Sequence, residues 1–140
     1  MSFQNIAKIA GSAMAAQTVR LNTIASNLAN ADAVSGNEAD TYHARKPVFA
    51  AVMGDGSGDF PNAGGRVQVL DVVESTEPLR KVYEPGNPLA NEDGVVFYPN
   101  VNPVAEMTDM MSASRAFETN VEVLGRVKVM QQSLLKLGEG

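Results

Sequence analysis

The sequence predicts an α+β fold in which two long terminal α-helices pack as a coiled coil, with a small β module inserted between them. All seven prolines lie between Pro47 and Pro103, so both ends lack the residue that most strongly interrupts helices. Apolar residues recur every seven positions near both ends, whereas short β-branched and aromatic runs occupy the middle. The expected division is an N-terminal helix within residues 1–31, a connector and β module over 32–103, and a C-terminal helix over 104–140.

The first helix is expected to run from about Phe3 to Ala31. A seven-residue spacing links apolar residues along it, and a second series lies three residues later; together they comprise Ala7, Met14, Leu21 and Leu28, then Ala10, Gln17, Ile24 and Ala31. This is a heptad seam of about four repeats, interrupted by the polar Gln17. At 1.5 Å per residue the helix would be roughly 43 Å long.

The second helix is expected to begin at "NPVAEM", where Asn102 is a good N-cap and Pro103 suits the first helical position. Its seven-residue series and flanking apolar positions are Met110, Phe117 and Leu124, with Met107, Ala113, Val121, Val127 and Leu134 beside them. Gly138 is expected to end the helix. The length would be roughly 50 Å.

The middle contains four β-branched and aromatic runs, which predict three or four short strands: "PVFAAVM", "RVQVLDVV", "LRKVY" and "GVVFY". A compact module of about 60 residues would be only roughly 20 to 25 Å across, too small to cover both helices. Apolar helical surface should therefore remain after the helices pair, and we expect that surface to bind other chains.

Catalysis and metal binding find little support in the sequence. The chain has one histidine, His43, and no cysteine, which excludes histidine-pair and thiolate zinc sites. The glycine-rich "GDGSGDF" at 54–60 lacks the glycine and glutamate that an EF-hand requires, and is interpreted as a surface loop. A small hydrolase in the β module is the rival hypothesis, but no Gly-x-Ser-x-Gly is present. We expect neither enzyme activity nor a cofactor or metal.

Charge and hydropathy narrow the choice of partners. The net charge is −5, and the best basic candidates are the isolated pairs at 45–46 and 80–81, so nucleic-acid binding is not expected. No apolar run approaches the roughly 20 residues that span a bilayer, so we expect no stable membrane insertion and no signal peptide or anchor.

The expected interface residues come from the two helical seams and from the asparagines in "SNLANADA". They are Ala7, Met14, Leu21, Ile24, Asn27, Leu28, Asn30, Met107, Met110, Phe117, Val121 and Leu124. Asn27 and Asn30 lie beside the Leu28 seam, where amides that donate and accept could fix the register between helices, as one buried asparagine does in coiled coils. The alternative is that one or both only end the helix.

Three sequence stretches resemble the axial proteins of the bacterial flagellum: "LNTIASNLANADA" at 21–33, "DGVVFYPNVN" at 93–102, and "NVNPVAEMTDMMSASRAFETNVEVL" at 100–124. The short length and the insertion "ADAVSGNEADTYHARK" after the first stretch are similar to the proximal rod (FlgC) family in particular.

The resemblance implies a structural subunit of the flagellar basal-body rod, which polymerises through its terminal helices into a drive shaft that crosses the periplasm. It implies self-association, contacts with other rod proteins and with the rod-base adaptor of the export gate, and secretion by the flagellar type III export apparatus. The alternatives are another axial protein, of a different rod or hook type, and a coiled-coil adaptor that does not polymerise.

Overall fold

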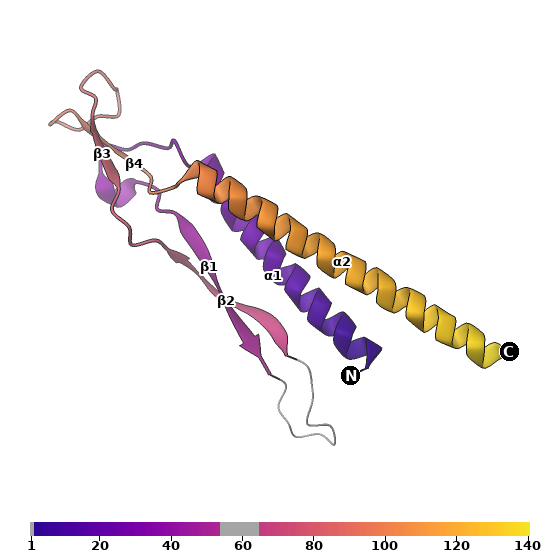
Figure 1. The fold of residues 1–140 in the computed structure, drawn as a ribbon. Helices are drawn as coiled ribbons and strands as arrows, with labels where there is room; N and C mark the ends of the chain where they lie inside the picture. The colour runs from indigo at the N-terminus through magenta and orange to yellow at the C-terminus, as the bar shows by residue number, and fades with distance from the viewer. Residues whose placement is uncertain (1, 54–64) are drawn as a thin grey trace.

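The computed structural model describes residues 2–53 and 65–140, so the expected loop at 54–60 lies outside the described residues. Two long helices lie at the ends of the chain, with short strands and one short 3-10 helix between them (Figure 1). In order, the elements are α1 (Phe3–Ala29), η1 (Glu38–Asp40), β1 (Arg45–Val52), β2 (Arg66–Glu74), β3 (Arg80–Tyr83), β4 (Val95–Tyr98) and α2 (Pro103–Glu139). The predicted fold class is confirmed.

α2 begins where its predicted capping residues indicated, and both helices end slightly differently from the prediction. The side chain of Asn102 accepts a hydrogen bond from the Ala105 amide, with Pro103 in the first turn of α2. α1 ends at Ala29, with Asn30 as its C-cap. The predicted stop at Gly138 is wrong, because α2 continues to Glu139; a glycine costs a helix only about 1 kcal/mol and does not end it by itself.

The helices pack against each other along their lengths and run in opposite directions, so both termini of the chain lie at the same end (Figure 1). With 27 and 37 residues they are about 40 Å and 55 Å long. α2 therefore continues past the start of α1, as Figure 1 shows.

The β module consists of two separate antiparallel ribbons, β1–β2 and β3–β4, rather than one sheet. In the first ribbon, a β-bulge leaves Leu70 without a partner on β1. The bulge shifts the alternation, so that Val67, Val69 and Val72 share one face although their numbers are not all odd. Without the bulge, Val72 would lie on the opposite face from Val67 and Val69.

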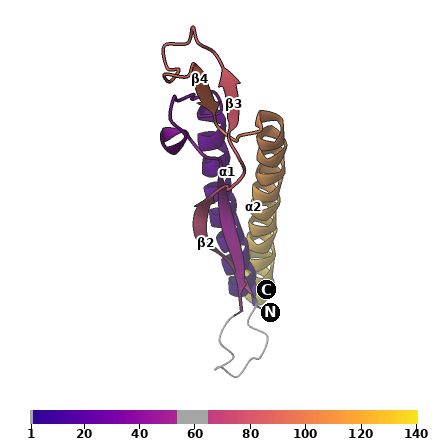
Figure 2. The same ribbon diagram turned by 90° about the vertical axis from the view of Figure 1, so that its left-hand side faces the viewer.

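The β1–β2 ribbon lies along α1, as both ribbon views show (Figures 1 and 2), and the backbone N–H of Val67 donates to Ser12 Oγ on that helix at 3.0 Å. A nine-residue strand spans roughly 30 Å. The expectation of a compact module that could not cover a long helix is therefore corrected for α1, because the ribbon is extended. Among the described helices and strands, the main contacts of α2 are with α1.

The loop between β3 and β4 depends on a glycine that no other residue can replace without strain. Gly94 has a φ of +73°, and a Cβ there would lie 2.9 Å from Tyr83 Cε2. We expect Gly94→Ala to lower the free energy of unfolding by about 1 to 2 kcal/mol, measured by urea unfolding followed by circular dichroism.

Gly86→Ala is the matched control, since Gly86 lies in the same loop and a Cβ there would meet nothing within 4 Å. Equal unfolding midpoints for the two variants would contradict the argument from backbone conformation.

Candidate functional site

The predicted interface residues fall into three groups by exposure. Ile24 and Asn27 are buried, at 2% and 1% exposed. Those that are half-buried are Ala7, Met14, Leu21, Leu28, Asn30, Met110, Phe117 and Leu124. Met107 and Val121 are exposed. The seams thus serve largely to pack the chain on itself, and a role of these residues in contacts between chains stays a prediction.

The start of α2 carries apolar residues on two opposite sides. Ala113 is fully buried and marks the side that faces α1. Val104, Met107 and Met111, at positions i, i+3 and i+7, lie on the other side of the helix, where all three are more than half exposed. We call these three residues the outer patch. Water-exposed apolar side chains grouped in this way are typical of a protein-binding surface.

The middle of α2 is charged on its outer side. Arg126 and Glu122, one helical turn apart, form an exposed ion pair at 3.0 Å. Beyond this charged turn, α2 again carries large exposed apolar side chains, which are Val129, Met130, Leu134, Leu135 and Leu137. We call these five residues the terminal patch. None of the five is among the predicted interface residues, and only Leu134 is among the apolar positions predicted beside the second seam.

Two shallow grooves are lined in part by residues of the terminal patch. One, of about 590 Å³, lies beside Gly125 and is lined by Val129 and Met130. The other, of about 610 Å³, lies where Phe3 at the start of α1 meets Leu134 and Leu135. Both have mainly apolar walls and could receive side chains from another helix.

The pairing of the two helices is fixed in part by a charged contact. The guanidinium of Arg20 on α1 donates from Nε and Nη2 to the two carboxylate oxygens of Asp109 on α2. A two-pronged arginine–carboxylate pair has a defined geometry, so it favours one alignment of the helices. The half-buried position of Arg20 reduces screening by water.

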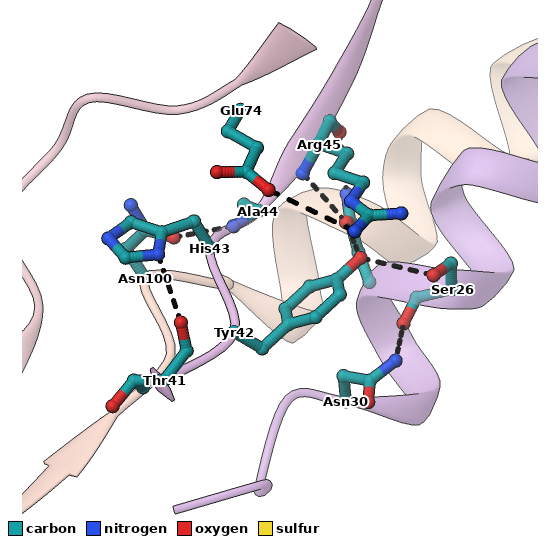
Figure 3. A network of polar contacts seen from close by, with 10 residues as sticks. Ser26, Asn30, Thr41, Tyr42, His43, Ala44, Arg45, Glu74 and Asn100 are labelled. Atoms are coloured by element: carbon teal, nitrogen blue, oxygen red, sulfur yellow. Dashed lines mark hydrogen bonds and ion pairs between the residues drawn. The ribbon is translucent and has the colours of Figure 1, made fainter. Parts of the chain in front are cut away.

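The two asparagines that the sequence singled out have different surroundings. Asn27 Nδ2 donates to the carbonyl of Arg45 at 2.9 Å, and Asn27 Oδ1 accepts from the Arg45 amide at 2.9 Å and from the Tyr42 hydroxyl at 2.8 Å. Asn30 Nδ2 donates to the Ser26 carbonyl of its own helix (Figure 3). The amide of Asn27 is therefore engaged by the connector and β1, whereas Asn30 closes the end of α1.

The polar groups of the second ribbon form a surface cluster. The hydroxyl of Tyr98 and the side-chain amide of Asn87 both donate to Glu84. These bonds hold the pKa of the Glu84 carboxyl below its ordinary value, first through Asn87 and then through Tyr98. The hydrogen bond to Glu84 also raises the pKa of the Tyr98 hydroxyl. Such bonds tie the β3–β4 loop to β4.

The described residues show little that could perform chemistry. His43 is a half-buried connector residue whose Nδ1 lies 3.0 Å from the Thr41 carbonyl, as Figure 3 shows. Over residues 2–53 and 65–140, no three acidic, histidine or cysteine side chains gather as metal ligands would. In the same ranges, no helix combines the length and apolar character needed to cross a membrane.

Comparison with known proteins gives matches at both ends of the chain and over its whole length. Residues 8–36 match the family described as "Flagella basal body rod protein", and residues 92–137 match "Flagellar basal body rod FlgEFG protein C-terminal".

Several relatives that match over nearly the whole chain carry the name "Flagellar basal-body rod protein FlgC". The chain is 50% identical over 139 residues to that of Escherichia coli O157:H7, covering 99% of this chain and 100% of the relative. The figures are the same for Salmonella typhimurium strain LT2. For Bacillus subtilis strain 168 the identity is 32%, over 94% of this chain and 95% of the relative.

Proposed function

Since the chain belongs to the FlgC family of flagellar basal-body rod proteins, we propose that it is built into the rod through its terminal helices. It is a structural subunit of the flagellar basal body and not an enzyme, and it assembles with other rod components. The observation that carries the proposal is the exposed apolar surface of α2, in the outer and terminal patches. Burying such surface contributes about 25 cal/mol per Å², so assembly would stabilise a helix that its own chain covers on one side.

The same exposed apolar surface suggests a role for each segment of the chain. In this proposal, the helices within residues 1–31 and 104–140 form the assembly core as coiled-coil contacts, and residues 32–103 form an outer module. The heptad seams, including Met107 and Val121 on the exposed side of α2, would supply contacts between subunits.

We also propose two specific binding partners. They are the rod-base adaptor of the export gate, and the type III export apparatus that would deliver the chain to a rod crossing the periplasm. The resemblance at 21–33 and 100–124 supports them, because these stretches are similar to those of exported axial proteins.

The function is tested by expressing the chain in a strain that lacks its own FlgC. We expect restored swimming in soft agar and the chain itself in purified basal bodies, detected by mass spectrometry. Restored swimming without the chain in basal bodies would instead indicate a non-polymerising adaptor. A hook-protein deletion strain is the control, and its rescue would indicate a hook-type subunit.

A further inference from the structure

Two asparagines from distant parts of the chain hold consecutive residues at the base of the β1–β2 ribbon. Asn27 lies near the end of α1, and Asn100 lies just before α2. Asn27 bonds both backbone groups of Arg45, the first residue of β1. Asn100 Oδ1 accepts from the amide of Ala44 at 2.6 Å (Figure 3). We call Asn27 and Asn100 the asparagine clasp.

The clasp also holds the other strand of the ribbon. Asn100 Nδ2 donates to the carbonyl of Glu77 at 2.8 Å and, more weakly, to that of Ser75 at 3.5 Å. Ser75 directly follows β2, and its amide donates to the Ala44 carbonyl at 2.7 Å. Both strands are thus attached, at one end of the ribbon, to the segments that carry the two helices.

The bonds of Asn27 replace a neighbouring strand. A primary amide offers a donor and an acceptor side by side, as a backbone residue does, so Asn27 pairs with the outer edge of Arg45 in the manner of a short β-ladder. Asn27 is nearly inaccessible to water, and in the described residues no fully buried side-chain nitrogen or oxygen lacks a partner. A buried pairing of this kind allows one orientation and penalises others.

We propose that Asn27 and Asn100 are positioning residues, which fix the direction of the β1–β2 ribbon relative to the helix pair and so present the ribbon correctly to a neighbouring subunit. This inference rests on the proposed function. It gives Asn27 a role within its own chain, in contrast to the predicted role between chains.

The test replaces each clasp residue by its isosteric acid, in the full chain expressed in the FlgC-deficient strain. Asn27→Asp keeps the acceptor but removes the donor and sets a carboxylate against the Arg45 carbonyl; Asn100→Asp does the same at Glu77. We expect both variants to lose swimming. Asn22→Asp is the matched control, since Asn22 is an exposed asparagine of the same helix and lies outside the predicted interface, and it should swim.

A cross-link distinguishes positioning from contact between chains. The chain has no cysteine, and the Ser12 Oγ–Val67 N distance of 3.0 Å puts the two Cα atoms within about 7 Å, near disulfide range. Cysteines introduced by Ser12→Cys and Val67→Cys should form a disulfide after export. In a chain that also carries Asn27→Asp, this disulfide should restore swimming, and a reductant that breaks it should abolish swimming again. An intrachain bond restores the ribbon's place but cannot replace a contact made by Asn27 to another subunit.

The outcomes separate the hypotheses. Normal swimming by Asn27→Asp, or a cross-linked Asn27→Asp chain that forms the disulfide and still does not swim, would overturn the proposal. A second readout is the fraction of chains that carry the disulfide in cells, measured on non-reducing gels. This fraction should be high in the double-cysteine chain with native Asn27 and lower in the double-cysteine chain with Asn27→Asp. An equal fraction in the two chains would also count against the clasp. If the unmodified chain fails to restore swimming, the proposed function fails, while the cross-linked fraction of the purified chain after oxidation in vitro still tests the clasp.

Discussion

Leu134→Glu is expected to abolish rod assembly and swimming while changing the stability of the isolated chain by less than about 0.5 kcal/mol. Leu134 is 55% exposed in the terminal patch, so a glutamate there remains hydrated in the free subunit. In a rod, where every subunit repeats the same contact, that carboxylate would be buried among apolar side chains without a partner. Each such contact would lose several kcal/mol, which a polymer cannot tolerate.

Gln132→Glu is the matched control, because Gln132 is an exposed polar residue of the same helix and the variant introduces the same charge. It should swim. The measurements are colony expansion in soft agar, electron microscopy of basal bodies, and thermal unfolding of the purified chain. A Leu134→Glu strain that swims normally would show that the terminal patch stays exposed to water in the rod.

The helices could be predicted because their signals are local. Heptad spacing and a capping asparagine lie within a few residues of the structure they specify, so Asn102 correctly marked the start of α2. The strand runs were similarly well placed, since β-branched residues favour extended backbone. The chain positions of all four strands differ little from the predicted runs.

The arrangement of these elements could not be predicted in the same way. Periodicity shows which side of a helix is apolar, but not whether another helix, a ribbon or another chain covers it. The division of the middle into two ribbons, with one extended along α1, depends on pairings such as Val67 with Ser12, which are distant in sequence.

Asn27 illustrates this limit most clearly. Its position near a heptad seam suggested contacts between helices, yet its partners are the backbone of Arg45 and the hydroxyl of Tyr42. An amide that pairs with a backbone leaves no side-chain signature on its partner, because any residue at position 45 except proline would offer the same two groups. The sequence therefore marked Asn27 as unusual without indicating what it bonds.

The second large effect is expected in the buried core, where Ile24→Ala should lower the free energy of unfolding by about 2 to 5 kcal/mol. Ile24 is 2% exposed and among the largest fully buried side chains. Ile24 shares its surroundings with Pro47 and Phe49 of β1 and with Ala105 of α2, and these neighbours can fill the space that a lost butyl group leaves only in part. Domains of this size are typically stable by only about 5 to 15 kcal/mol, so the loss would be a large share of the total.

Val129→Ala provides the comparison, since it also shortens an aliphatic side chain on a long helix but at a site that is 60% exposed. Urea unfolding of the two purified variants should separate them clearly, with Val129→Ala within about 0.5 kcal/mol of the unmodified chain. The two substitutions also separate folding from assembly: Ile24→Ala should reduce the amount of folded chain in cells, whereas any swimming defect of Val129→Ala should occur at normal abundance. If Ile24→Ala unfolded at the same urea concentration as Val129→Ala, the packing around Ile24 would have to be loose enough to collapse into the vacated space.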